Sequence, residues 1–146
     1  MFGKPSLLTR VTIAKMVGFA FGLIIGFLAA PAFGVDDMKL RLAILFWYTT
    51  IGAFIGVAGV MTRHPLLNMK FPWWLTGAAI GGWMNFVLVL FAWDVFAPIM
   101  AGGAFWGFTS PWWMVFDGLF AGFVIAGLAT RVGGEGPATV QDRGYS

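Results

Sequence analysis

Three polar side chains stand inside long apolar runs of this sequence, and they are the residues best suited to chemistry. Asp117, Asn85 and Thr49 each lie a turn or two from one end of such a run. Ionisable and polar groups are costly in a hydrocarbon environment, so they mark candidate sites. Asn85 is in line with Gly77 and Gly81 on a helical repeat. Thr49 and Asp117 also align with small residues, so we expect all three to point into helix contacts.

Two roles fit these three residues. The first is a polar site in the outer half of a helix bundle that binds a cation, a proton or a ligand headgroup. The second is interhelical hydrogen bonding that fixes packing, worth about 0.6 kcal/mol on average. We favour the second role, because a carrier usually places its coupling acids near the midplane in broken helices. The inner halves of these runs hold no ionisable residue and consist mainly of Gly, Ala and larger apolar residues.

Most other site chemistry is excluded by composition. The chain has no Cys, which removes disulfides, thiolate zinc sites, iron–sulfur clusters and cysteine nucleophiles. Its one histidine, His64, precedes a proline in a basic loop, and we interpret it as a solvated turn residue. The sequence contains no Ser–His–Asp set, phosphate loop or paired-carboxylate motif. We therefore predict no catalytic residue, no metal and no cofactor, and we expect bound lipid only.

The elements that carry these residues are predicted to be membrane spans. The chain is 60% hydrophobic and 10% charged, with a mean hydropathy of +0.86. Soluble domains carry about 25% charged residues, so this chain has too few charges to cover the surface of a soluble fold. Apolar runs near 20 residues mark membrane helices. We predict a basic lead over 1–15, a transmembrane domain over 16–131 with spans at about 16–32, 42–61, 73–96 and 113–130, and a flexible Gly-rich tail over 132–146.

The first span has a second interpretation. Ala30-Pro31-Ala32 fits the small-x-small pattern cut by signal peptidase, after an apolar run and a basic lead. Cleavage there would leave three spans with the same sidedness, so charge counting does not separate the two interpretations. The chain starts at Met1 with this segment in place, and we therefore expect four spans.

Charge and aromatic residues predict the orientation. Lys and Arg concentrate on the side of the two termini, so both termini should be cytoplasmic in a bacterial-type inner membrane. The net charge of +3 arises from these helix-end residues and does not indicate a nucleic-acid partner. Tryptophans at span ends are expected to anchor in the headgroup region, namely Trp73, Trp74, Trp112 and Trp113.

Every predicted span carries small residues at four-residue spacing. These stripes are Gly18, Gly22 and Gly26 in the first span, Gly52 and Gly56 in the second, Gly77 and Gly81 in the third, and Gly118 and Gly122 in the fourth. Small faces let helices approach closely in a bilayer. The fold class we predict is an all-α integral membrane protein with four helices packed through Gly/Ala faces.

We expect the protein to act as a non-catalytic accessory or structural subunit of a larger membrane complex. Its partners would be membrane lipid and other membrane subunits, or further copies of itself. The alternative is a small homo-oligomeric channel or carrier with Thr49, Asn85 and Asp117 at its site. Replacing Asp117 by Asn separates the two functions, because only a carrier should lose coupled transport.

Overall fold

Four long helices make up most of the protein. The structure is a computed structural model that describes residues 4–102 and 107–140. Those residues form α1 (Leu7–Leu23), η1 (Ile24–Ala29), α2 (Ala30–Ala32), α3 (Met38–Ala58), α4 (Trp73–Phe91), α5 (Trp93–Gly102), α6 (Trp113–Gly133) and η2 (Pro137–Thr139). The segments α1, η1 and α2 follow one another without a break and form one helix with a π-helical turn near its end.

The predicted all-α class is confirmed, and so is the presence of four helices long and apolar enough to be the predicted spans. The continuous helix Leu7–Ala32 has 26 residues, and α3, α4 and α6 have 21, 19 and 21. Each is long and apolar enough to cross a membrane, as expected of a multi-pass membrane protein. The outermost residues of the predicted lead and tail, 1–3 and 141–146, lie outside the described residues.

The first helix begins earlier than the sequence suggests. It starts at Leu7, within the predicted lead, whereas the predicted span starts at Met16. Ser6 caps it, since its side-chain oxygen accepts a hydrogen bond from the backbone N–H of Thr9 at 3.4 Å. The helix includes Arg10, which is buried. Because its hydrogen-bond partners lie inside the bundle, this cation does not have to stay outside the helix packing.

The third predicted span is divided into two helices. α4 ends at Phe91, and Ala92 has φ −112° and ψ 20°, which breaks the helix before α5. The predicted third span, 73–96, therefore bends near its end. α6 is longer than predicted and continues through Gly133, where Gly134 leaves the helix with φ 77°. The tail that follows α6 packs back onto the bundle. Gly134, Gly136 and Thr139 are all buried there.

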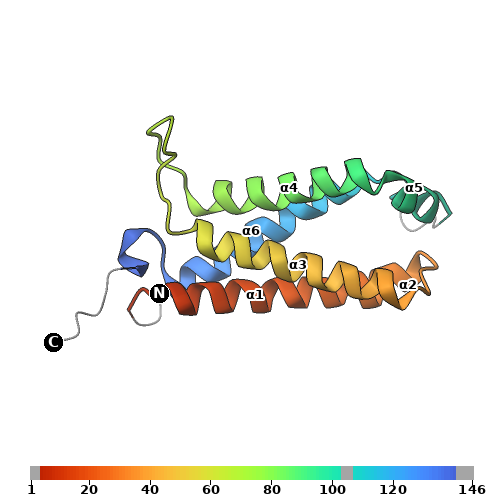
Figure 1. Ribbon diagram of the computed structural model, residues 1–146, viewed down its shortest axis with the longest axis horizontal. Coiled ribbons are helices and arrows are strands. Elements are labelled where there is room, and N and C mark those ends of the chain that lie inside the picture. Colours follow the sequence, from red (N-terminus) through yellow and green to blue (C-terminus); the bar gives the residue numbers. More distant parts are fainter. Residues whose placement is uncertain (1–3, 103–106, 141–146) are drawn as a thin grey trace.

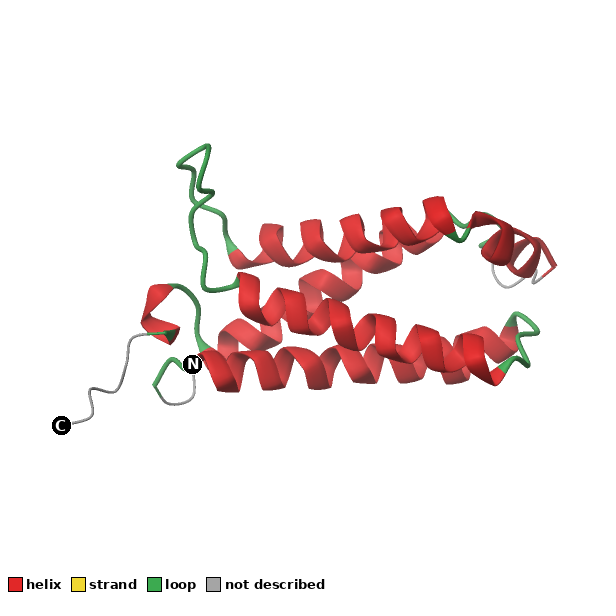
Figure 2. Cartoon of the chain, in the orientation of Figure 1, coloured by secondary structure: helices red, strands yellow, loops and turns green. Residues whose placement is uncertain are grey.

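The helices form two antiparallel pairs (Figure 1). α1 packs along α3, and α4 packs along α6, while α1 and α6 join the pairs to each other. We call the end of the bundle with the start of α1 and the end of α6 the termini end, and the other end the α5 end. Contact between α3 and α4 is sparse. Most loops are short, but the loop 59–72 projects sideways from the termini end (Figure 2).

The glycine stripes face one another inside these pairs. A Cβ on Gly18 would overlap the Tyr48 carbonyl oxygen of α3, and one on Gly81 would overlap the Gly118 carbonyl oxygen of α6. All nine predicted glycines have this relation to the backbone of a neighbouring helix: Gly18, Gly22, Gly26, Gly52, Gly56, Gly77, Gly81, Gly118 and Gly122. The stripes thus serve packing within this chain, and a partner would have to use another surface.

Candidate functional site

Asn85 is the centre of a buried polar network near the α5 end of the bundle. Its side chain is 0% exposed on α4, on the four-residue row of the α4 glycines. Its Oδ1 accepts a hydrogen bond from Trp47 Nε1 at 3.0 Å. Its Nδ2 donates to the Tyr48 hydroxyl at 3.2 Å and to the Met114 carbonyl at 2.7 Å. One amide thus links α3, α4 and α6, as buried polar groups require partners.

Asp117 joins the same network through Tyr48. The Tyr48 hydroxyl donates to Asp117 Oδ2, and the tyrosine itself is 2% exposed. Asp117 is half-buried on α6. The structure therefore brings the two predicted residues Asn85 and Asp117 together, but with a tyrosine between them. Carboxylate, hydroxyl and amide form one connected chain across three helices.

Thr49 is not part of this network. Its Oγ1 donates to the Leu45 carbonyl of its own helix at 2.8 Å, a common way for Thr to satisfy its hydroxyl inside a helix. Tyr48 and Trp47 take the place that the sequence analysis gave to Thr49. A signal for Tyr48 is present, since it lies four residues before Gly52 and eight before Gly56 on the row that faces α1. Tyr48 was not predicted as a site residue because aromatic residues in membrane helices are generally expected to anchor at the headgroups or to face lipid.

A second polar site, around Arg10, occupies the termini end. Arg10 is 1% exposed. Its Nε donates to the Gly56 carbonyl of α3 at 3.0 Å. Its Nη1 donates to Thr130 Oγ1 of α6 at 2.8 Å and to the Gly134 carbonyl at 2.5 Å. One guanidinium therefore connects α1, α3, α6 and the segment after α6, which suits the fixed fork of donors in arginine.

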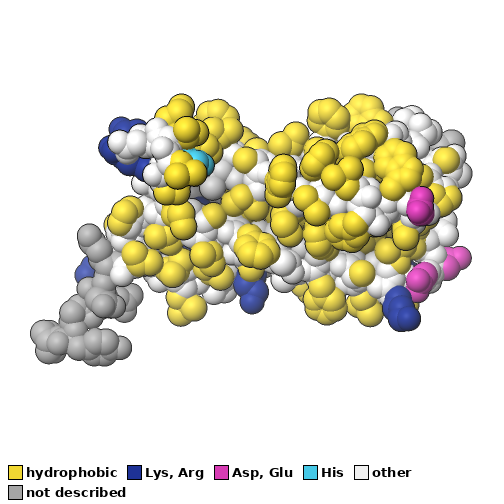
Figure 3. Space-filling model, turned by 45° about the horizontal axis from the view of Figure 1, so that its top comes forward, with side chains coloured by type: hydrophobic (Ala, Val, Ile, Leu, Met, Phe, Trp, Pro, Cys, Tyr) yellow, Lys and Arg dark blue, Asp and Glu magenta, His cyan; other side chains and the backbone are white. Residues whose placement is uncertain are grey.

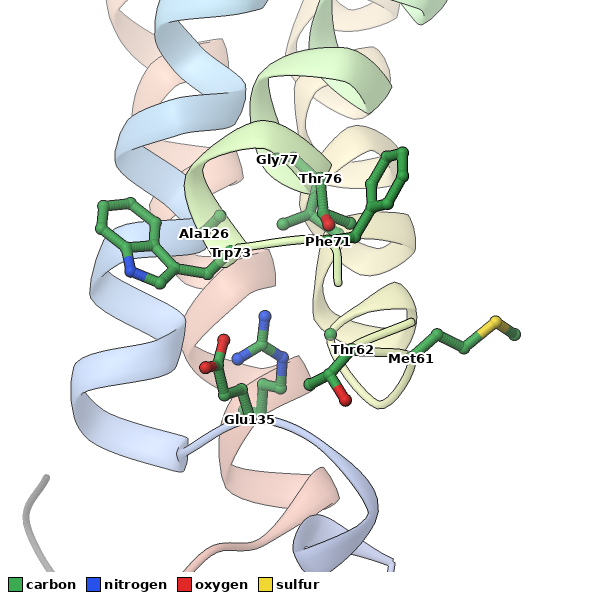
Figure 4. Close-up of a pocket in the computed structure, with 11 residues that line it drawn as sticks. Met61, Thr62, Phe71, Trp73, Thr76, Gly77, Ala126 and Glu135 are labelled. Atoms are coloured by element: carbon green, nitrogen blue, oxygen red, sulfur yellow. The ribbon is translucent and has the colours of Figure 1, made fainter. Parts of the chain in front are cut away.

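Missing side chains make room for Arg10. A Cβ on Gly59 would overlap the guanidinium, and a Cβ on Gly133 would meet the Arg10 backbone. Glu135 acts on Arg10 as an opposite charge and lines the same narrow cleft. Figure 4 shows the Glu135 carboxylate directed into this cleft, with Thr62 and Trp73 around it. The guanidinium therefore fills the space between α1, α3 and α6 at the termini end of the bundle.

In the sequence, Arg10 lies in the predicted basic lead, where Lys and Arg indicate only the orientation of the chain. A signal was present, because Arg10 lies four residues before Ala14 and eight before Gly18, on the same row as the α1 glycines. The row of α1 that carries the glycines packs against α3, so the residue on the same row in the preceding turns should face α3 as well. The arginine at that position is therefore directed into the bundle.

Arg41 makes a related contact at the α5 end. Its Nε donates to the Gly26 carbonyl at 3.1 Å, and its guanidinium lies 4.7 Å from the centre of the Phe27 ring. Gly26 and Phe27 belong to η1, the π-helical turn. Single π-helical turns inside α-helices are rare and recur at functional positions. Arg41 satisfies a carbonyl of this turn from the neighbouring helix.

The predicted anchor tryptophans lie at helix starts at both ends of the bundle. Trp74 of α4 is 48% exposed, and Trp112 and Trp113 beside α6 are 43% and 45% exposed. Trp73 is only half-buried and packs against Phe123 at 5.3 Å between ring centres. Three of the four are therefore exposed over somewhat less than half of their surface. Trp73 also serves the contact between α4 and α6.

Neither polar site has the composition of a metal centre. Within residues 4–102 and 107–140, no three His, Asp or Glu side chains are grouped closely enough to hold a metal ion. His64 lies in the loop 59–72, where its Nδ1 accepts from the N–H groups of Leu66 and Leu67 at 3.3 and 3.2 Å. Comparison with protein-family models, curated proteins and solved structures finds no match for this chain. Function must therefore be argued from the geometry.

Proposed function

We propose that the protein is a non-catalytic multi-pass subunit of a larger complex in a bacterial-type inner membrane. Both termini would be cytoplasmic. The charge distribution supports this orientation: Arg63, Lys70 and Arg131 follow or flank helix ends at the termini end, whereas Asp36, Asp37 and Asp94 lie at the α5 end. Figure 3 shows Asp and Glu side chains, with a Lys or Arg beside them, at one end of the visible face, and His with Lys or Arg at the other. Cytoplasmic loops carry such a basic excess.

One observation carries the subunit proposal, an exposed row of aromatic rings that starts in the middle of α4. Trp83 contacts Phe86 at 5.7 Å between ring centres, Phe86 stacks on Trp112 at 6.0 Å, and Trp112 contacts Trp93 at 5.7 Å. We call these four residues the aromatic row. Trp83 is 65% exposed. The row runs along the outside of the bundle from mid-helix to the α5 end.

Lipid anchoring accounts for only part of this row. Trp side chains collect at the headgroup level, and Trp93 and Trp112 lie near helix ends where that applies. Trp83 is ten residues into α4, about 15 Å along the helix at 1.5 Å per residue. A mid-span tryptophan presented outward suits a protein partner, because interface cores are enriched in aromatic residues and Trp is a frequent hot spot.

The test is extraction from native membranes in a mild detergent, followed by the size and composition of what co-purifies. Other polypeptides at fixed stoichiometry are expected with the wild-type chain. Trp83→Leu keeps the position apolar and should release them. Phe46→Leu is the matched control, since Phe46 is 60% exposed on α3. Recovery of this chain as a small homogeneous oligomer without other polypeptides would overturn the proposal.

The second candidate is a homo-oligomeric channel or carrier, and the polar network favours it. Asn85, Tyr48 and Asp117 connect three helices, and Asp117 is only half-buried. Intramembrane acids often mark ion or proton pathways. Four spans are few for a private pathway, so at least a dimer would be needed. Asp117→Asn should abolish coupled flux in liposomes in this case. Full flux in that variant would eliminate the candidate.

A further inference from the structure

The loop 59–72 is an ordered hairpin. The Phe71 N–H donates to the Thr62 carbonyl at 2.8 Å, and the His64 N–H donates to the Met69 carbonyl at 2.9 Å. The turn is closed by the Asn68 N–H, which donates to the His64 carbonyl at 2.9 Å, and Asn68 has φ 48°. The His64 ring lies 5.4 Å from the Phe71 ring, centre to centre. The backbone of this hairpin is therefore held in place by its own hydrogen bonds.

The hairpin holds two like charges opposite each other. Arg63 and Lys70 form an antiparallel bridge, and residues paired in this way project their side chains from the same face. Like charges directly opposite destabilise a strand pair. Both side chains are exposed, and neither has a hydrogen bond or ion pair within the described residues. An anion between the guanidinium and the ammonium would relieve this repulsion.

The tip of the same hairpin is apolar. Leu66 is 88% exposed, Leu67 is 62% exposed and Met69 is 58% exposed. A free phosphate or another small soluble anion would make no use of these three side chains. A phospholipid would, since its phosphate meets the cations and its hydrocarbon meets the tip. The combination of basic face and apolar tip selects an anionic lipid among the anions that the charges alone would accept.

An apolar groove begins next to the hairpin. It lies between α3 and α4, whose mutual contact is sparse, and its volume is about 510 Å³. Its α3 wall ends at Ala58, one residue before the hairpin starts. No polar or charged residue lines it, and the lining consists of Phe54, Ala58, Ala79, Ile80, Trp83 and Met84.

We propose that the hairpin and this groove form a binding site for one anionic phospholipid. The phosphate lies between Arg63 and Lys70, and one acyl chain runs along the groove between α3 and α4. Juxtamembrane Lys and Arg bind anionic headgroups, and basic pockets beside transmembrane helices hold such lipids. The inference rests on the membrane placement proposed above, with the hairpin on the cytoplasmic side, but it does not require a protein partner.

The experiment is native mass spectrometry of the full chain after incubation with equal amounts of phosphatidylglycerol and phosphatidylcholine. The wild type should retain phosphatidylglycerol preferentially. In the double variant Arg63→Gln/Lys70→Gln, the ratio of phosphatidylglycerol to phosphatidylcholine retained should fall on the order of tenfold. This follows from the contribution of each basic residue near a membrane surface. The control is Lys15→Gln/Arg131→Gln, which removes two exposed charges outside the hairpin and should keep the preference.

Several results would overturn the site. Equal retention of both lipids by the wild type would do so, as would an equal loss of preference in both double variants, which would indicate general charge attraction. Ala79→Phe fills the groove and should lower the total lipid retained with either headgroup. Unchanged retention would remove the groove from the site. If the hairpin variant keeps its lipid preference but releases a co-purifying polypeptide, the hairpin binds protein instead. Trp83 belongs both to the aromatic row and to the groove, so the lipid site is tested only with variants at Arg63, Lys70 and Ala79. The lipid results therefore do not depend on whether Trp83→Leu releases other polypeptides.

Discussion

Arg10 and Arg41 make the same kind of hydrogen bond at opposite ends of the α1–α3 pair. Arg10 Nε of α1 donates to the Gly56 carbonyl of α3 at 3.0 Å, and Arg41 Nε of α3 donates to the Gly26 carbonyl of the first helix at 3.1 Å. Because the helices are antiparallel, each arginine reaches the last glycine of the other helix's stripe. The contact between the glycine stripes of the first helix and α3 thus has an arginine hydrogen bond at each of its two ends.

The two arginines should differ in their contribution to stability. Arg10 is buried and has three hydrogen bonds, whereas Arg41 is half-buried and has one to a backbone carbonyl. Arg10→Met would leave buried acceptors without donors and should lower the free energy of unfolding by about 3 kcal/mol. Arg41→Met should cost about 1 kcal/mol. Denaturation in detergent micelles measures both.

Arg10→Lys is the informative companion to that comparison. It keeps the charge, but one ammonium cannot reproduce the fork that reaches α3, α6 and the Gly134 carbonyl together. We expect most of the loss seen with Arg10→Met. Wild-type stability in Arg10→Lys would mean that the charge matters and the hydrogen-bond geometry does not.

The second prediction concerns the glycine contacts between α4 and α6. Gly81→Ala places a methyl group against the Gly118 carbonyl, so the two helices must separate and lose packing along their length. We expect a loss of about 2 kcal/mol or more, comparable with overpacking in a dense core. The measurement is the unfolding midpoint in a mild detergent.

Gly102→Ala is the matched control for that substitution. Gly102 ends α5, and a Cβ there would meet no atom of the described residues within 4 Å. The variant should be neutral or slightly stabilising, since Ala has the better helix propensity. If both alanine variants behave alike, the α4–α6 contact is not as close as the structure has it.

A third prediction concerns the polar network. Tyr48→Phe removes the hydroxyl that donates to Asp117 and accepts from Asn85. It should destabilise the fold by about 1 kcal/mol, within the range for interhelical hydrogen bonds in membranes. A double-mutant cycle with Asp117→Asn should give a non-zero coupling energy, because the two side chains are in contact.

Thr49→Val is the control for the network. Thr49 bonds only to its own helix among the contacts that the structure describes, and Val has nearly its shape. The change in stability should stay within about 0.5 kcal/mol. A loss as large as that of Tyr48→Phe would return Thr49 to the site that the sequence suggested for it.

The sequence predicted four long apolar helices and their packing through glycines, because the length of an apolar run and a four-residue spacing can both be read directly from the chain. It could not show which stripe meets which, since any two small faces are compatible; the pairing of α1 with α3 is a property of the fold. Arg10 and Tyr48 were missed for a related reason. Their residue types usually indicate orientation and anchoring, and only their phase on the stripes showed that they point inward. The break at Ala92 has no Gly or Pro to mark it.

The last prediction concerns the segment that follows α6. Gly134 has φ 77° and ψ −175°, and Gly136 has φ 81° and ψ −173°. This region is open essentially to glycine alone. The two glycines let the chain turn back so that the Gly134 carbonyl meets Arg10 and the Gly136 N–H donates to the Gly59 carbonyl at 2.8 Å. Both contacts tie the segment to the bundle.

Gly136→Ala should therefore release this segment while leaving the four long helices in place. The new methyl group would also meet Thr62 at 3.2 Å. Amide hydrogen exchange over residues 134–140 should become faster, and exchange within α1 and α3 should change little. Gly34→Ala is the control: Gly34 has φ 80° at the opposite end of the bundle, with no atom within 4 Å of an added Cβ. Faster exchange of residues 134–140 in both variants would mean that the segment responds to general destabilisation and is not held by these two contacts.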